Sequence, residues 1–210
     1  MLRETGAVWW DTQPRHSPGG RKVMADQETG RLLTDTEKEE LLEIAKQSIE
    51  SRLTGKKGSG AEPAGPELKR GAFVSLHRRG RLRGCIGCIE ARSEKLGRTV
   101  REMASAAAFN DPRFPPLKKE ELQDLDIEIS VLTPMRKITD INEIKIGMHG
   151  LYIVNGFCSG LLLPQVATEY GWEPITFLEE TCRKAGLPPG SWKNPETQIY
   201  VFSADIFGSR

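Results

Sequence analysis

The sequence predicts an α+β fold with a mainly antiparallel sheet. Two patterns carry this prediction. Short β-like runs come in pairs joined by tight turns, of which Arg78-Arg79-Gly80 and Asn155-Gly156 are the strongest hairpin signals. Helical segments are inserted between these hairpins, an arrangement typical of α+β proteins. With 210 residues, the chain is long enough for one sizeable core and a small second lobe.

The first predicted element is a helix that begins at Thr34. Thr34 and Glu37 have the spacing of a capping box, in which each side chain accepts a hydrogen bond from the backbone N–H group of the other residue. Apolar residues then recur at helical spacing and predict one face turned to the core: Leu42, Ala45, Ile49 and Leu53. The glycine-rich segment over residues 55–65 predicts a flexible linker or loop.

A hairpin and a long helix follow this linker. Residues 72–77 predict a strand, and the turn after it leads back into a second strand. Residues 93–110 predict a helix that ends before Pro112, because a residue that precedes proline avoids the helical conformation. Three prolines stiffen the loop over residues 111–117. Residues 118–122 predict a short turn of helix.

The second half of the chain predicts further strands and two short helices. Residues 126–132 alternate between apolar and polar side chains, as in a strand with one buried face. Residues 145–163 predict two or three short strands. A proline at a first helical position predicts helices over residues 164–170 and 174–185. Residues 198–206 predict a final strand.

Composition and net charge indicate a soluble cytoplasmic protein. The net charge is +1, and there is no run of about 18 apolar residues that could span a membrane. The N-terminus lacks an apolar segment followed by a small-residue cleavage site, and four cysteines are ordinary for a reducing compartment. Residues 1–33 show no period and predict a disordered N-terminal extension ahead of one domain over residues 34–210, with Met24 as an alternative start.

The segment from Gly80 to Glu90 is the strongest candidate for a functional site. It holds three glycines, two arginines and two cysteines directly after a predicted strand. Glycine costs a strand roughly 0.5–1 kcal/mol relative to alanine. Three glycines therefore indicate a bend, a bulge, or the close approach of a ligand or another backbone. A thiol and two guanidinium groups beside such a bend favour a binding or reaction site.

Five segments, in order along the chain, resemble the AMMECR domain family. They are Leu82-Arg83-Gly84-Cys85-Ile86-Gly87, Asp111-Pro112-Arg113-Phe114-Pro115-Pro116, Gly147-Met148-His149-Gly150-Leu151, Leu162-Leu163-Pro164-Gln165-Val166, and the stretch through Trp172, Phe177-Leu178 and Ala185-Gly186-Leu187. Together they cover roughly residues 35–207 and look most like the bacterial and archaeal branch called AmmeMemoRadiSam system protein A. The resemblance implies an α+β protein of two unequal lobes separated by a cleft, with both chain ends in the larger lobe.

The resemblance also implies partners, but no established reaction. Genes of this branch tend to accompany a Memo-like protein and a radical SAM enzyme. The CxxxCxxC motif expected of a radical SAM cluster is absent from this sequence, so the chain is not the radical enzyme itself. No cofactor is implied. Cys88 departs from the family pattern, which usually has a small or hydroxyl residue at this position.

Cys85 is the candidate nucleophile of the central motif. Nearby positive charge lowers the pKa of a thiol, and Arg83 would share a face with Cys85 in a regular strand. Nucleophilic catalysis also needs a base, for which His149, in a segment that matches the family, is the best candidate. The structural alternatives are a small buried thiol that packs beside glycines and a histidine that caps a turn.

A redox pair or a zinc site at Cys85 and Cys88 is less favoured. The Cα atoms of a disulfide lie within about 7 Å, whereas three residues of extended strand span roughly 10 Å. One CxxC motif supplies only two zinc ligands, and the others would have to come from Cys158, Cys182 or His149. We therefore expect no metal site.

Binding of an anionic small molecule is the preferred interpretation of the motif. Backbone N–H groups at glycines beside arginines suit a carboxylate or a phosphate. Six basic residues occur within fifteen positions without an intervening acid: Lys69, Arg70, Arg78, Arg79, Arg81 and Arg83. The candidate ligand-binding residues are Arg81, Arg83, Gly84, Gly87, Arg113 and Glu128. Arg113 could instead anchor its loop by pairing with Asp111, and Glu128 could be a solvated strand residue.

Together these observations predict a small-molecule-binding component, an enzyme or an enzyme accessory. The resemblance implies that it acts with Memo-like and radical SAM partner proteins. Its cleft would be lined by Cys85, Arg113, Glu128 and His149. Nucleic acid is not the expected partner, because the chain is near neutral and no aromatic residues interleave the arginines. The rival hypothesis is a non-catalytic adaptor that docks partner proteins through the glycine- and arginine-rich hairpin.

Overall fold

The computed structural model describes residues 31–55, 65–91 and 93–209. The predicted N-terminal extension and the alternative start at Met24 therefore lie outside the described residues, except for the end of the extension. At that end, Leu33 is buried in a hydrophobic core, and its backbone N–H group donates to Asp205 Oδ2 over 2.9 Å. Leu33 belongs to the folded part of the chain, one residue ahead of the predicted domain start.

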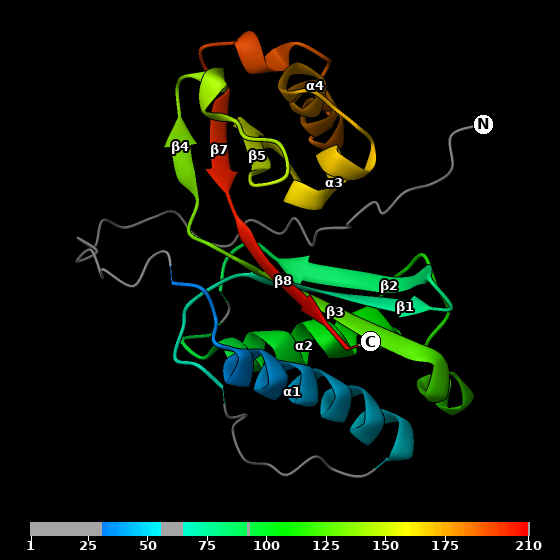
Figure 1. Ribbon diagram of the computed structural model, residues 1–210. Helices are drawn as coiled ribbons and strands as arrows, with labels where there is room; N and C mark the ends of the chain where they lie inside the picture. Colours follow the sequence, from blue (N-terminus) through cyan, green and yellow to red (C-terminus); the bar gives the residue numbers. More distant parts are fainter. Residues whose placement is uncertain (1–30, 56–64, 92, 210) are drawn as a thin grey trace. The chain divides into compact units, whose positions relative to one another are not determined.

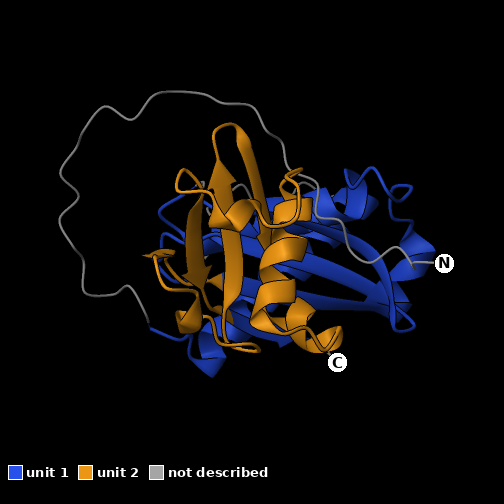
Figure 2. Cartoon of the chain, turned by 90° about the horizontal axis from the view of Figure 1, so that it is seen from above, with its two compact units in different colours: residues 1–131, 205–210 blue, residues 132–204 orange. Residues whose placement is uncertain are grey.

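The chain divides into two compact units (Figures 1 and 2). Unit 1 contains residues 1–131 and 205–210, and unit 2 contains residues 132–204. Each unit combines helices with a four-stranded sheet whose strands pair antiparallel, so the predicted α+β class is confirmed. The larger unit uses both ends of the chain, as the family resemblance implies.

The sheet of unit 1 has the strand order β2-β1-β3-β8. β1 (Ala72–Arg78) pairs with β2 (Arg81–Cys88) on one side and with β3 (Leu125–Leu132) on the other, and β8 (Ala204–Gly208) forms the far edge. The predicted hairpin at residues 72–88 is thereby confirmed. β2 is an edge strand, so one side of its backbone has no strand partner among the described residues.

Two helices cover one face of this sheet (Figure 1). α2 (Leu96–Phe109) packs on β1 and β2, and α1 (Asp35–Thr54) packs on α2. The predicted capping box at the start of α1 is present in full. The buried stripe of α1 begins at Leu41 rather than at Leu42, which is only partly buried. The core between the helices and the sheet includes Leu41, Ala45, Ile49, Val74, Leu76, Val100 and Ile129.

The sheet of unit 2 has the strand order β4-β7-β5-β6. β5 (Gly150–Asn155) and β6 (Cys158–Leu162) form the second predicted hairpin, in which Gly156 takes a positive φ of 57°. β7 (Gln198–Phe202) pairs with β5 and with β4 (Arg136–Ile138), a short strand that the sequence pattern did not predict.

Two α-helices and two single-turn 3₁₀ helices complete unit 2. α3 (Pro164–Glu169) and α4 (Pro174–Lys184) both begin at the predicted prolines, whose missing N–H groups would have no partner in a first turn anyway. α4 packs on β5 and β6. Its buried Phe177, Leu178 and Cys182 join the core of this unit. The 3₁₀ helices are η2 (Ile141–Glu143) and η3 (Ser191–Lys193).

The predicted final strand over residues 198–206 is two strands that belong to different sheets. β7 lies in the sheet of unit 2 and β8 in the sheet of unit 1, and the chain changes sheets at Ser203. Ser203 exchanges two 2.8 Å hydrogen bonds with Thr133, which lies where the chain leaves β3 of unit 1 for β4 of unit 2. A strand-like run of residues cannot reveal such a change of sheet, because both strands have the same period.

In the part of the chain that the structure describes, no helix has the length and apolar character needed to span a membrane.

Candidate functional site

The β1–β2 hairpin contains a β-bulge at Arg83. Arg79 and Gly80 form its turn and take positive φ angles of 52° and 71°. If the two strands paired regularly from this turn, Ser75 would lie opposite Gly84. Arg83 has no partner in β1, so the register shifts by one residue and Ser75 pairs with Cys85.

Cys85, Ser75 and Glu128 form a row across three strands, which we call the polar row. Ser75 is the register partner of both Cys85 in β2 and Glu128 in β3, and side chains of directly opposed residues share one face of a sheet. This face is the one opposite the helices, because Val74 and Leu76 on either side of Ser75 belong to the helix-side core. Ser75 Oγ donates to Cys85 Sγ over 3.2 Å.

The loop after α2 holds the backbone of Cys85 at the open edge of the sheet. The N–H group of Cys85 donates to Asp111 Oδ2 over 2.8 Å, and its carbonyl oxygen accepts from Arg113 Nη2 over 3.1 Å. Arg113 also donates through Nε and Nη2 to the two Asp111 oxygens, over 3.0 and 2.7 Å. The prediction that Arg113 anchors its loop through Asp111 is confirmed. The two family segments that contain Cys85 and Asp111 therefore make one structural unit.

This arrangement favours a neutral thiol. Cys85 is only 7% exposed, and burial raises the pKa of its thiol, although the Ser75 hydroxyl and the charge of Arg113 act in the opposite direction. Burial alone would raise the pKa of Asp111, but hydrogen bonds from Arg113 and from the Cys85 N–H group hold it below its ordinary value. The pKa of Arg113 is raised, mainly by Asp111, with Cys85 among the smaller causes. A charged pair thus lies beside a protonated Cys85.

Two glycines of the central motif have packing reasons of their own. A Cβ atom on Gly84 would lie 2.2 Å from the carbonyl oxygen of Ala107 in α2. A Cβ atom on Gly87 would lie 2.1 Å from the ring of Phe73, which is 1% exposed. The packing alternative therefore explains both glycines by itself. Their assignment to ligand binding stays a prediction.

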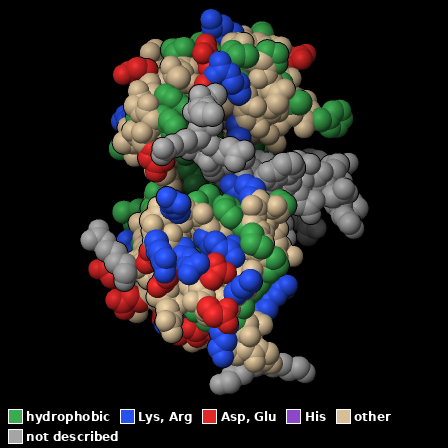
Figure 3. Space-filling view, turned by 90° about the vertical axis from the view of Figure 1, so that its right-hand side faces the viewer, with side chains coloured by type: hydrophobic (Ala, Val, Ile, Leu, Met, Phe, Trp, Pro, Cys, Tyr) green, Lys and Arg blue, Asp and Glu red, His purple; other side chains and the backbone are tan. Residues whose placement is uncertain are grey.

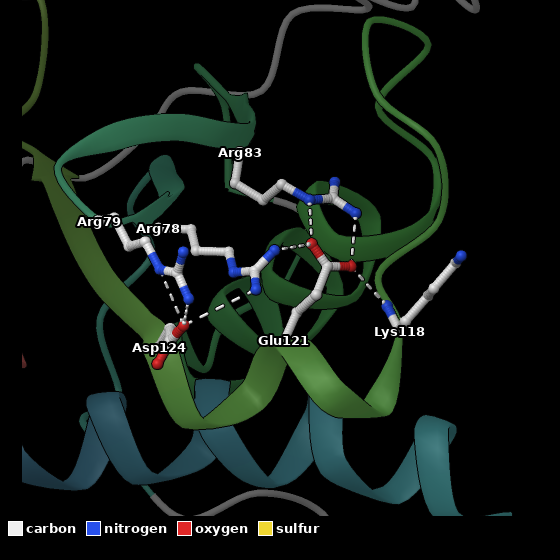
Figure 4. A network of polar contacts seen from close by, with 6 residues as sticks. All are labelled: Arg78, Arg79, Arg83, Lys118, Glu121 and Asp124. Atoms are coloured by element: carbon white, nitrogen blue, oxygen red, sulfur yellow. Dashed lines mark hydrogen bonds and ion pairs between the residues drawn. The ribbon is translucent and has the colours of Figure 1, made fainter.

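Arg83 belongs to a network of ion pairs with the 3₁₀ helix η1 (Lys119–Asp124) (Figure 4). Arg83 Nε and Nη2 donate to the two oxygens of Glu121, over 2.8 and 3.0 Å. Glu121 also accepts from the Lys118 backbone N–H group and from Arg78 Nη1. The hydrogen bonds from Arg83 are the main reason that the pKa of Glu121 is lowered to about 2. The bulge thus gives Arg83 an acidic partner in η1, although the sequence around the arginines contains no acid.

Phe114 links this network to the Asp111–Arg113 loop. The guanidinium carbon of Arg113 lies 5.4 Å from the centre of the Phe114 ring, and that of Arg83 lies 6.0 Å from it. Both distances suit cation–π contacts. Arg81, the remaining arginine of the motif, is exposed at the start of β2.

His149 lies in unit 2, whereas Cys85, Arg113 and Glu128 lie in unit 1. Its Nδ1 atom accepts from the backbone N–H group of Lys145 over 3.3 Å, so the turn-capping alternative is confirmed. Burial, and then the charge of Arg136, lower the pKa of the imidazole, which favours the neutral ring. A role for His149 as a catalytic base stays a prediction.

The cysteines do not form a redox pair. Cys85 points to the polar row, whereas Cys88 belongs to the helix-side core, on the opposite face of β2. All four cysteines are free thiols, and Cys182 is fully buried, as expected of a core residue. Within residues 31–55, 65–91 and 93–209, no group of three or more His, Cys, Asp or Glu side chains could hold a metal ion.

Sequence reasoning missed Ser75, Phe114 and Glu121. Ser75 follows from the pairing of two predicted strands only if the bulge is known, since a regular hairpin would place it opposite Gly84. Glu121 lies outside the arginine-rich segment, and only the fold brings the two together. The family segment around Arg113 was the one signal that could have identified Phe114.

Comparison with known proteins supplies the family. The AMMECR1 family model matches residues 42–207. A protein of Methanothermobacter thermautotrophicus is 45% identical over 176 residues, which cover 80% of this chain and 91% of that protein. The crystal structure of the uncharacterized protein PH0010 from Pyrococcus horikoshii matches with a TM-score of 0.76 and 41% identity, and the match covers 85% of this chain and 94% of that one. The chain belongs to the AMMECR1 family.

Proposed function

We propose that this protein is a small-molecule-binding component, an enzyme or an enzyme accessory, whose ligand binds along the polar row. The observation that carries the proposal is a line of four different polar groups that crosses three strands of one sheet and ends at the loop beside its β2 edge. The line runs from the carboxylate of Glu128 through the Ser75 hydroxyl and the Cys85 thiol to the Arg113 guanidinium. A sheet face that served only for packing would not need four different polar groups in one line.

The two ends of the line define the chemistry of the ligand. Arg113 makes no hydrogen bond through Nη1 to any described residue, so this N–H₂ group can donate to a carboxylate or a phosphate. Glu128, on the third strand, accepts hydrogen bonds and suits a hydroxyl or amino group. Adjacent strands lie about 4.8 Å apart, so these groups span roughly 10 Å or more. The proposed ligand is therefore an anionic molecule that carries a hydrogen-bond donor at its other end.

Cys85 contributes a neutral thiol in the unliganded protein. Because burial raises its pKa, nucleophilic attack by Cys85 would require transfer of its proton to a base. A thiol that accepts a hydrogen bond from Ser75 and stays protonated suits ligand recognition. The proposal keeps Cys85 and His149 as catalytic candidates and the polar row as the binding site.

The proposal extends to partners and compartment. Motifs such as Leu82–Gly87 resemble the AmmeMemoRadiSam branch, which supports action with a Memo-like protein and a radical SAM enzyme. The four free thiols suit a reducing cytoplasm. Co-purification of the three proteins, expressed together, tests the partnership.

Ligand binding is testable by titrating the ¹⁵N-labelled full chain with a library of small carboxylic acids and phosphate esters. We expect at least one compound with a hydroxyl or amino group to shift the backbone amide signals of Ser75, Cys85 and Glu128. Glu128→Gln should weaken that compound about tenfold or more, because a hydrogen bond to a charged group contributes about 1.5–3 kcal/mol.

Asp126→Asn is the matched control, since Asp126 is an exposed carboxylate two residues away on the same strand. It should leave the affinity within about twofold. The proposal fails if no compound at millimolar concentration shifts these signals. It also fails if the two variants weaken binding equally.

A further inference from the structure

We propose that the end of the β1–β2 hairpin and the start of η1 form a docking surface for an acidic peptide segment of a partner protein. This hairpin-end surface consists of Arg78, Arg79, Arg81, Arg83 and Lys118. It is distinct from the polar row, because the bulge directs Arg83 to Glu121 and away from Cys85. The inference is independent of the small-molecule proposal.

The hairpin-end surface concentrates positive charge. Arg78, Arg79, Arg83 and Lys118 gather around two acids, Glu121 and Asp124 (Figure 4). With Arg81 at the start of β2, the surface has five basic residues and two acids, which leaves three cations in excess. Lys119 and Glu120 in η1 add one charge of each sign. The whole chain has a net charge of only +1, so the charge is distributed unevenly. The side of unit 1 shown in Figure 3 carries a group of Lys and Arg side chains with acidic side chains beside them.

The acids of η1 orient the arginines rather than neutralise the surface. Glu121 fixes Arg83, whose side chain is only 12% exposed. Asp124 accepts from Arg79 Nε and Nη2, over 3.1 and 2.9 Å, while the Arg79 side chain stays 76% exposed. An oriented guanidinium loses less conformational entropy when it binds a carboxylate. The fixed pairs therefore prepare the surface for an anionic partner.

The outer cations have no acid of their own. In Figure 4 the Lys118 side chain extends away from Glu121, which contacts only its backbone N–H group. Arg81 is exposed and forms no ion pair with a described residue. Arg81 and Lys118, together with the exposed Arg79 that Asp124 orients, are distributed over a hairpin turn and the start of a helix. This spacing suits several carboxylates along an extended segment better than one small anion.

A protein partner fits this surface better than a nucleic acid. Glu121 and Asp124 interrupt the basic groups and would repel a continuous phosphate backbone. Single-stranded nucleic acids bind through bases that stack on aromatic rings. The aromatic ring in contact with this surface, Phe114, already contacts both Arg83 and Arg113 and is only partly exposed. Separated carboxylates of a peptide can instead pair with individual cations.

The test is fluorescence anisotropy of a labelled hexaglutamate peptide with the full chain at low ionic strength, about 0.01–0.02 M. We expect saturable binding that weakens about tenfold or more at physiological ionic strength, because exposed charges are screened there. The double variant Arg81→Glu/Lys118→Glu should weaken binding at least tenfold. Both side chains are exposed, so the variant should keep the unfolding midpoint of the wild type, which is checked in parallel.

The matched control is Lys137→Glu/Lys145→Glu, which makes the same change in net charge with two exposed lysines of unit 2. It should leave binding within about twofold. Absence of binding to the wild type, or equal losses in both double variants, overturns the proposal. Tighter binding of a single-stranded oligouridylate, abolished by the same hairpin-end variant, overturns it in favour of a nucleic-acid surface.

Discussion

Asp111→Asn is expected to lower the free energy of unfolding by about 3 kcal/mol. The Asp111 side chain is 1% exposed and accepts hydrogen bonds from the Cys85 N–H group and from three nitrogens of Arg113. The neutral amide cannot balance the Arg113 charge, and its NH₂ group cannot accept a hydrogen bond. Removing one partner of a buried ion pair typically costs about 3–5 kcal/mol, and we take the lower end because Arg113 is partly exposed.

Urea unfolding at neutral pH measures this loss. Asp124→Asn is the control, because it breaks an exposed pair with Arg79 and should cost at most about 1 kcal/mol. The Asp111 carboxyl has a folded pKa below its ordinary value, so its contribution is complete above the unfolded pKa and disappears as the pH falls through the folded pKa. The wild type and Asp111→Asn should therefore converge in acid. A loss of less than about 1 kcal/mol at neutral pH would show that the loop does not hold Cys85 in place.

Gly84→Ala should destabilise the protein by about 3 kcal/mol. The added methyl group would lie 2.2 Å from the Ala107 carbonyl oxygen, a backbone atom inside α2 that cannot rotate away. Either β2 or α2 would have to move, and Ala104, Ala107 and Ala108 of α2 are buried. Overpacking of this kind typically costs about 1–3 kcal/mol, and a contact between two backbone segments belongs at the upper end.

The same urea experiment measures the effect of Gly84→Ala. Gly80→Asn is the control within the hairpin: a Cβ atom there would meet nothing within 4 Å, and asparagine tolerates its φ of 71°. The control should cost less than about 1 kcal/mol. If Gly84→Ala were as stable as the wild type, β2 and α2 would not approach as closely as the structure shows, and the packing account of the central motif would be wrong.

Local signals in the sequence predicted most of the fold. The capping box at Thr34 and Glu37, the Arg79-Gly80 turn and the prolines that start α3 and α4 each depend on residues close together in the chain. The pairing of Arg113 with Asp111 was predictable for the same reason. These features were found because neighbouring residues decide them.

Contacts between distant residues could not be predicted in this way. The bulge at Arg83 changes the partner of Ser75, and no residue near Ser75 signals it. Glu121 reaches Arg83 from 38 positions away. The change of sheet at Ser203 depends on the strands that flank β7 and β8. In each case the sequence contains the residues, and only the tertiary structure determines which of them meet.

These differences change the interpretation of the central motif. Its positive charges were expected to activate Cys85, but Arg83 pairs with Glu121, and Arg113 pairs with Asp111. Arg83, which a regular strand would place on the same face as Cys85, is therefore not the electrostatic partner of the thiol. The Asp111–Arg113 loop instead holds Cys85 as a buried, neutral thiol at one end of the polar row.

The state of Cys85 can be measured through the rate of iodoacetamide labelling at each cysteine, followed against pH by peptide mass spectrometry. Burial raises the pKa of Cys85 above its ordinary value of 9.0, so less of it is thiolate at any given pH. We predict slow labelling of Cys85 in the folded protein up to at least pH 9.0, with the partly exposed Cys158 labelled faster. Rapid labelling of Cys85 near neutral pH, ahead of Cys158, would contradict the account and identify an accessible, activated thiolate.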